Sequence, residues 1–101
     1  MAEAALDDPS RMERNVARLV AERDRLAAAL EDLGFDVHPS TANFLLCRVG
    51  DVAGVVAERL FDEGLVVRRF TDPRLLDHLR FTVRSPEEDD RLIDALRRAI
   101  P

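Results

Sequence analysis

The apolar residues of the N-terminal third of the chain recur every three or four positions, a spacing typical of one face of a helix. The pattern predicts a single long helix that begins at Asp8-Pro9 and runs to about Leu33, where Gly34 ends it. Residues 1–7 lack this spacing and are predicted to be a frayed lead-in. The charged residues between the apolar positions, Glu22, Arg23, Asp24, Arg25 and Glu31, are predicted to face solvent. The predicted buried positions are Met12, Val16, Leu19, Val20, Leu26, Ala27, Leu30 and Leu33.

Two shorter helices are predicted further along the chain. The first covers about residues 52–61, with Asp51 as its cap and Gly64 after its end. The second begins at Ser85-Pro86, where a capping serine, a proline at the first position and two acidic residues form a strong start signal. The predicted buried residues of this last helix are Leu92, Ile93, Leu96, Ala99 and Ile100.

Strands are predicted in the segments between these helices. Residues 35–38 form a short extended piece that Pro39 ends. Residues 43–49 are almost continuously apolar, which predicts a central strand covered on both faces. Residues 65–68 follow the second helix, so residues 43–68 are predicted to form a strand-helix-strand unit with a right-handed parallel crossover. Residues 79–83 alternate between apolar and polar, as a half-buried strand does.

Together these elements predict a single α+β domain over residues 1–101. Its sheet is expected to be small and mixed, with three or four strands, and the helices to pack on it as a two-layer sandwich. A chain of 101 residues is long enough to bury roughly two-thirds of its unfolded surface. An apolar content of 47% and a charged content of 35% are typical of a soluble globular fold.

The balance of charges narrows the range of functions. A formal net charge of -5 argues against binding nucleic acid through a basic surface, although a local arginine cluster can still bind a small anion. All fifteen basic residues are arginine. Because the chain contains no lysine, it cannot by itself complete a mechanism that needs a lysine Schiff base or a lysine general base.

The cysteine and the histidines suggest no further chemistry. Cys47 is the only cysteine and lies in an apolar run, which favours a small buried residue over a nucleophile. His38 has no Cys or second His at ligand spacing, and the only other histidine is His78, so no metal site is predicted. The chain shows no apolar leader and no run of about 20 apolar residues, so a cytoplasmic protein without a membrane span is expected.

The strand over residues 79–83 carries the sharpest candidate for a binding site. Alternation places its three apolar residues on one face and Arg80 with Thr82 on the other, so the Arg80 guanidinium is displayed on a rigid base. The planar fork of a guanidinium matches a carboxylate or a phosphate with two hydrogen bonds. One interpretation is therefore an anion site, and the other is a solvated or salt-bridged arginine on an open sheet face.

Three short motifs, in order along the chain, carry a resemblance to a known family. They are Ser40-Thr41-Ala42-Asn43-Phe44-Leu45-Leu46, then Gly64-Leu65-Val66-Val67-Arg68, then Leu79-Arg80-Phe81-Thr82-Val83 followed by Pro86-Glu87-Glu88. Together they resemble the C-terminal small domain of class I and II pyridoxal-phosphate aminotransferases, and they look closest to the histidinol-phosphate aminotransferases. The long first helix, through Glu22-Arg23-Asp24-Arg25-Leu26, is similar to the helix that enters that domain.

The resemblance implies an activity and a role for three residues. In that family a large domain holds pyridoxal phosphate and the Schiff-base lysine, and the small domain closes over the substrate. The arginine that Arg80 matches binds the anionic end of the substrate, a carboxylate or a phosphate, and the one that Arg68 matches helps to hold the phosphate. Asn43 matches an asparagine near the site. The implied reaction is amino-group transfer between glutamate or 2-oxoglutarate and a phosphorylated or carboxylated amine, in histidine biosynthesis and amino-acid metabolism.

Two departures from the family pattern bear on this reading. Arg84 stands where the family usually has glycine, and it either reshapes the turn beside the substrate or points to solvent. The large domain is not among these 101 residues, so no catalytic or cofactor-binding residue is assigned and the chain alone is expected to be inactive.

Three functions therefore stay open. The chain is the small domain of an aminotransferase whose large domain is supplied separately, or a free-standing module for small anions, or a dimerisation domain whose arginines make only salt bridges. Apolar surface that a large domain would otherwise cover also predicts self-association into a homo-oligomer.

Overall fold

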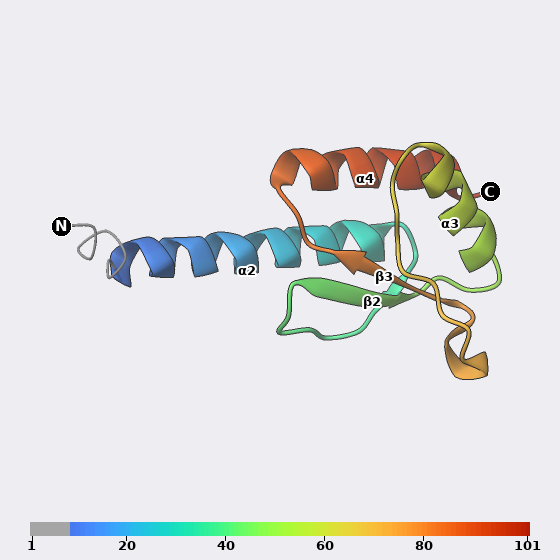
Figure 1. Ribbon diagram of the computed structural model, residues 1–101, viewed down its shortest axis with the longest axis horizontal. Helices are drawn as coiled ribbons and strands as arrows, with labels where there is room; N and C mark the ends of the chain where they lie inside the picture. The colour runs from blue at the N-terminus through green and yellow to red at the C-terminus, as the bar shows by residue number, and fades with distance from the viewer. Residues whose placement is uncertain (1–8) are drawn as a thin grey trace.

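The computed structural model describes residues 9–101, and within them three α-helices pack on a three-stranded sheet (Figure 1). The predicted lead-in over residues 1–7 and the predicted cap Asp8 lie outside the described residues. The α+β class is confirmed. The elements are α2 (Pro9–Asp32), β1 (Asp36–Val37), β2 (Phe44–Arg48), α3 (Ala53–Asp62), the 3-10 helix η1 (Pro73–Leu75), β3 (His78–Thr82) and α4 (Pro86–Ala99).

The sheet has the strand order β1-β2-β3, and each hydrogen-bonded pair of neighbours is antiparallel. Residues 65–68, predicted as a full strand, contribute one antiparallel bridge between Arg68 and Arg80. The predicted mixed sheet is therefore wrong, because every pairing in it is antiparallel. The chain returns through η1 and inserts β3 between β2 and Arg68, so these two segments run in the same direction without pairing.

The hydrophobic core lies on one face of the sheet only. Leu45 and Cys47 of β2 are buried, whereas Phe44 is exposed and Leu46 is half-buried. The prediction that this strand is covered on both faces is wrong, because the buried residues of the helices join the core on the side of Leu45 and Cys47. Cys47 is buried as predicted, and burial raises the pKa of its thiol to about 12. The helices contribute Leu26, Leu30, Ala53, Val56, Ala57, Leu60, Leu92, Ile93, Ala95, Leu96 and Ala99.

Only the C-terminal half of α2 packs on the rest of the domain. Leu26 and Leu30 are fully buried, while Figure 1 shows the first half of the helix extending past the sheet. The apolar spacing predicted the helix correctly, but the predicted burial of its first four apolar positions is wrong within residues 9–101. These exposed positions are Met12, Val16, Leu19 and Val20.

The ends of the helices follow the predicted signals unevenly. Ser85 Oγ accepts a hydrogen bond from the Glu88 N–H at 3.2 Å and donates one to Glu88 Oε1 at 3.0 Å, which confirms the predicted cap of α4. Asp51 is not the cap of α3, because Val52 takes that position and no side chain caps it. Gly34 and Gly64 have φ values of 94° and 82°, as expected of glycines that end a helix. Within residues 9–101, none of the helices has the length and apolarity that crossing a bilayer requires.

Candidate functional site

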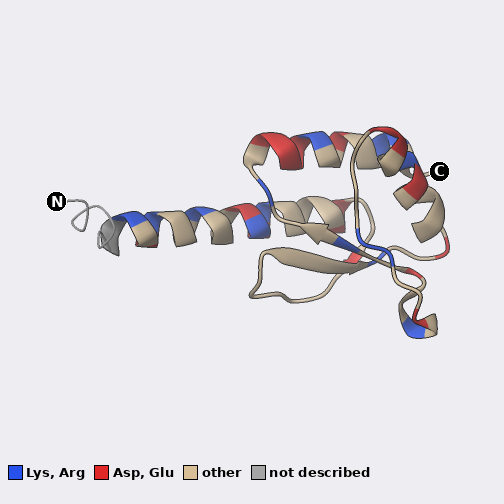
Figure 2. Ribbon diagram, viewed as in Figure 1, with Lys and Arg blue, Asp and Glu red and all other residues tan. Residues whose placement is uncertain are grey.

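Arg68 and Arg80 lie opposite each other at the outer edge of β3. The Arg80 N–H donates to the Arg68 carbonyl oxygen at 3.0 Å, and the Arg68 N–H donates to the Arg80 carbonyl oxygen at 3.1 Å. Two residues that exchange both hydrogen bonds are directly opposite and project their side chains from the same face of a sheet. Because Leu79 and Phe81 point into the core, that face is the open one, and Figure 2 shows basic positions of β3 and of the preceding segment lying close together.

The Arg80 guanidinium is held in place by an aromatic ring but lacks a hydrogen-bond acceptor. Its central carbon lies 4.9 Å from the centroid of the Phe44 ring, which supports the plane of the guanidinium on one side. Its Nε atom is buried and has no hydrogen-bond partner among the described residues. A buried donor without an acceptor costs about 1–3 kcal/mol, and more when it is charged. An anion that approaches the open face could supply the missing acceptor.

None of the ion pairs within residues 9–101 involves Arg68 or Arg80. By contrast, Arg25 and Arg48 each have a carboxylate oxygen at 2.8 Å. No carboxylate in the described part of the chain therefore supports the interpretation of Arg80 as a salt-bridged residue. Like charges directly opposite each other in a sheet are mutually repulsive, and an anion between them would relieve that repulsion.

Asn43 and Arg84 lie further along the same strands. The Asn43 carbonyl oxygen accepts a hydrogen bond from the Val83 N–H at 2.7 Å, three residues and about 10 Å beyond Arg80. The structure therefore brings Arg68 and Arg80 together and places Asn43 at the other end of the strand pair. Arg84 is exposed, and no non-glycine residue in the described part of the chain has a positive φ, so the turn accommodates a side chain without strain.

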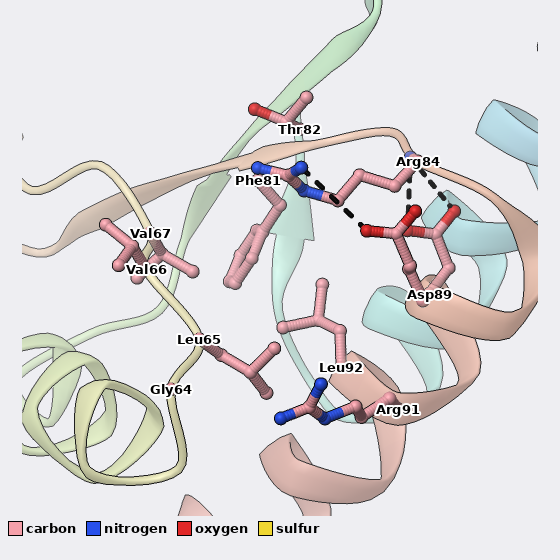
Figure 3. Close-up of a pocket in the computed structure, with 11 residues that line it drawn as sticks. Gly64, Leu65, Val66, Val67, Phe81, Thr82, Arg84, Asp89, Arg91 and Leu92 are labelled. Carbon is pink, nitrogen blue, oxygen red and sulfur yellow. Dashed lines mark hydrogen bonds and ion pairs between the residues drawn. The ribbon is translucent and has the colours of Figure 1, made fainter.

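A hollow of about 250 Å³ lies between residues 64–67, β3 and α4 (Figure 3). Phe81 and Leu92 form part of its apolar lining, and Arg84 and Arg91 lie at its edges. Neither Arg68 nor Arg80 lines it. The arginine pair thus occupies an open surface, which would need a second surface over it to exclude water from a bound anion.

A buried carboxyl pair that the sequence analysis missed joins α2 to α4. Glu22, predicted to face solvent, is 8% exposed, and Asp89 is 1% exposed. Glu22 accepts from Arg25 Nε and Nη2, each at 2.9 Å, and Asp89 accepts from the Arg84 N–H at 3.2 Å. The Arg25 hydrogen bonds lower the pKa of Glu22, while burial and the hydrogen bond to Glu22 raise the pKa of Asp89 to about 7.

Helical spacing could have identified both acids. Asp89 stands three, four and seven residues before Leu92, Ile93 and Leu96, and Glu22 stands four residues before Leu26. Their acidic side chains argued against burial more strongly than their spacing argued for it, because acidic residues are seldom buried without a partner.

The structure also brings the two histidines of the chain together. His38 and His78 are 40 positions apart, and their Nε2 atoms are separated by 3.2 Å. Sequence spacing gave no sign of this contact, because it depends on how β1 and β3 flank β2. Within residues 9–101 no group of three or more His, Cys, Asp or Glu side chains is placed to hold a metal ion.

Comparison with known proteins agrees with the fold. The model of the family "Aminotransferase class I and II" matches residues 1–96. The histidinol-phosphate aminotransferase of Roseiflexus castenholzii is 45% identical over 99 residues, which cover 93% of this chain and 27% of that protein. The crystal structure of the histidinol-phosphate aminotransferase from Clostridium acetobutylicum matches with a TM-score of 0.78 and 26% identity, over 90% of this chain and 29% of that one.

A second similar structure carries the cofactor of the family. The histidinol-phosphate aminotransferase of Sinorhizobium meliloti, in complex with pyridoxal 5'-phosphate, matches with a TM-score of 0.78 at 24% identity, over 96% of this chain and 28% of that one. This chain has no lysine to form a Schiff base with that cofactor, so its residues do not fit the group by themselves. The family match over residues 1–96 and the 45% identity to a relative show that the chain belongs to the class I and II aminotransferases, and it spans about a quarter of the length of the relatives it matches.

Proposed function

We propose that this chain is the substrate-binding small domain of a pyridoxal-phosphate aminotransferase of the histidinol-phosphate type. Arg80, assisted by Arg68, holds the anionic end of the substrate. The observation that supports this role is the buried Arg80 Nε without an acceptor, next to a second arginine that has no carboxylate partner in the described residues. The sequence pattern and the bridge between the two residues favour the same site.

The arrangement suits a phosphate better than a carboxylate. A phosphate monoester carries close to two negative charges at neutral pH and three acceptor oxygens, so it can engage two guanidinium groups at once. Arg80 presents a planar fork whose orientation Phe44 restricts, and Arg68 adds a second charge from the opposite side of the bridge. Asn43, at the other end of the strand pair, is then placed toward the part of the substrate that carries the amine.

The remaining parts of the reaction are assigned to a large domain that this chain does not contain. That domain supplies pyridoxal phosphate, the Schiff-base lysine and the second wall over the open face. The contribution of this chain is to position the substrate, since a fixed anion contact orients the amine toward the cofactor. Amino-group transfer between glutamate or 2-oxoglutarate and a phosphorylated amine is the reaction proposed, and the isolated chain is expected to be inactive because it has no lysine.

Apolar surface on α2 supports a protein partner. Met12 and Val16 are 62% and 59% exposed, and Leu19 lies on the same helix at 43%. A contiguous apolar stripe of this kind marks an interaction surface in most proteins. The large domain is the occupant proposed for it, and in the isolated chain the same stripe is expected to cause self-association, which sedimentation velocity would detect. A strictly monomeric isolated chain would remove that expectation.

The anion site is tested by thermal unfolding of the chain with phosphate, histidinol phosphate or glutamate, each titrated into the millimolar range. At a ligand concentration a hundredfold above the dissociation constant, one-site binding stabilises the folded state by about 2.7 kcal/mol. We expect this gain to disappear in Arg80→Ala and in Arg80→Met. It should persist in the control Arg74→Ala, which removes an exposed arginine whose partner is the nearby Asp72.

The same variants separate a binding role from a structural one. Because the buried Arg80 Nε has no acceptor, Arg80→Met should leave the ligand-free chain as stable as the unmodified one or more stable. An equal rise of the unfolding midpoint in Arg80→Met and the unmodified chain would contradict the anion site.

The role of the large domain has a separate test. Mixing the chain with a polypeptide that supplies the large domain should restore cofactor-dependent transamination, and Arg80→Ala should lower the restored activity. Anion binding by the isolated chain together with failure to pair with any large domain would instead favour the free-standing module. Failure of both experiments would leave the dimerisation domain as the function that fits.

A further inference from the structure

We propose that His38 and His78 form a two-imidazole site for a divalent transition-metal ion such as Zn²⁺ or Cu²⁺. His38 is exposed and His78 is 9% exposed, and their Nε2 atoms are 3.2 Å apart. Two nitrogens that each lie about 2.0–2.1 Å from a tetrahedral zinc ion are separated by about 3.3 Å. The distance between the imidazole nitrogens is therefore already close to the separation expected of two nitrogens bound to one metal ion.

The backbone fixes this distance through the register of the sheet. His38 follows β1, and its N–H donates to the Leu46 carbonyl oxygen at 3.0 Å. His78 begins β3 and pairs with Arg48 of β2. The two histidines thus stand on either side of β2, anchored by hydrogen bonds to it, and the site is built on strands instead of on a mobile loop.

The orientation of His78 is that of a metal ligand. Asp77 Oδ1 lies 2.7 Å from His78 Nδ1, and Asp77 Oδ2 accepts a hydrogen bond from Arg48 Nε at 2.8 Å. The Asp77 carboxylate, which is paired with Arg48, is placed to accept the Nδ1 proton of His78. The lone pair of His78 then lies on Nε2. A carboxylate on the far nitrogen is the usual way in which proteins orient a metal-binding imidazole.

His38 completes the site without a change of charge. The two ring planes are parallel to within 7°, and their centroids are 5.3 Å apart. In the absence of metal, we expect His38 Nε2–H to donate to His78 Nε2 across the 3.2 Å contact. When a metal ion binds, His38 carries its proton on Nδ1 instead, both rings tilt, and the ion takes the place of that proton. His38 is exposed, so water can fill the other coordination positions.

Other charged groups lie close to the site. Asp77 pairs with Arg48, and Arg23, Asp24 and Glu31 of α2 line a hollow together with His38. Asp36 of β1 is the residue opposite Arg48 on its other side. The chain has no other histidine, and its one cysteine is buried in the core, so imidazole-dependent metal binding would have to come from this pair.

The test is a calorimetric titration of the chain with ZnCl2 and CuSO4 in a buffer that does not coordinate metals. We expect one equivalent of each ion to bind, Cu²⁺ more tightly than Zn²⁺, and saturating Zn²⁺ to raise the unfolding midpoint. The electron paramagnetic resonance spectrum of the Cu²⁺ form should show two equatorial imidazole nitrogens. Both titrations should weaken as the pH falls, because protons compete for the imidazoles.

Variants separate this site from unspecific binding. His38→Ala, at an exposed position, should fold and should abolish binding of one equivalent of Zn²⁺, as should His78→Ala. Asp77→Asn removes only the orienting carboxylate and should weaken Zn²⁺ binding by about 10–100-fold. Retention of the same stoichiometry and affinity in the double variant His38→Ala/His78→Ala, or no binding at millimolar Zn²⁺, would overturn the proposal.

Discussion

Replacing Phe81 with alanine is expected to lower the free energy of unfolding by about 3–5 kcal/mol. Phe81 is 1% exposed, and its ring stacks on that of Phe35 with 6.4 Å between centroids. It pairs with Leu45 in the β2–β3 ladder, so its loss opens a cavity where sheet and helices meet. Small domains have a total stability of about 5–15 kcal/mol, so the variant is expected to be at the edge of folding.

The measurement is urea unfolding, with the midpoint and the slope of the transition recorded for each variant. Phe44→Ala is the matched control, because it makes the same chemical change on the neighbouring strand. Phe44 is 37% exposed and lies on the open face, where it contacts Arg80 and not the core. We expect a much smaller loss of stability from this variant. Equal losses from the two variants would mean that both faces of the sheet are covered, and the open-face anion site would then be untenable.

The helices and the faces of the strands were predictable because their signals are local. Apolar spacing located α2, α3 and α4, and the Ser85 cap could be predicted from Ser85 and the residues that follow it. Alternation correctly placed Leu79 and Phe81 in the core and Arg80 on the other face. Periodicity reports which side of an element is apolar, and it needs no knowledge of what lies across from it.

The neighbours of each strand were not predictable in the same way. Residues 43–68 have the strand-helix-strand order of a parallel crossover, yet β3 is inserted between the two extended segments. A local pattern cannot show that insertion, because it is decided by contacts between residues far apart in the chain. For the same reason the exposed apolar positions of α2 were predicted to be buried: the spacing is apolar, but nothing within residues 9–101 covers them.

The candidate site contains some residues that were predictable from the sequence and others that were not. The family resemblance pointed to Arg68 and Arg80, but only the bridge between them shows that they form one pair. The contact between His38 and His78 had no sequence signal at all, since it follows from the strand register. The resemblance implied a place near the site for Asn43 with less support than for the arginines, and the structure separates its backbone from them along the strands.

The stability of the chain is expected to fall as the pH rises from about 5 to about 7. Burial and the hydrogen bond to Glu22 raise the pKa of Asp89 from 3.8 to about 7 in the folded chain. Between these values the folded state holds a proton that the unfolded chain has released, so the free energy of unfolding decreases with pH, by an amount on the order of a few kcal/mol. The lowered pKa of Glu22 acts in the opposite sense, but only below its ordinary value of 4.5.

Asp89→Asn isolates this effect without disturbing the packing. The amide oxygen can accept the Arg84 N–H, and the amide nitrogen can donate to Glu22, as the protonated carboxyl does. Urea unfolding at a series of pH values should show the variant about as stable as the unmodified chain at pH 5, and more stable at pH 8. Its stability should be nearly flat between these values. A parallel decline in both proteins would place the titrating group elsewhere. A decline that is absent from both would mean that Asp89 is already ionised in the folded state, paired with Arg25 through a rearranged contact between α2 and α4.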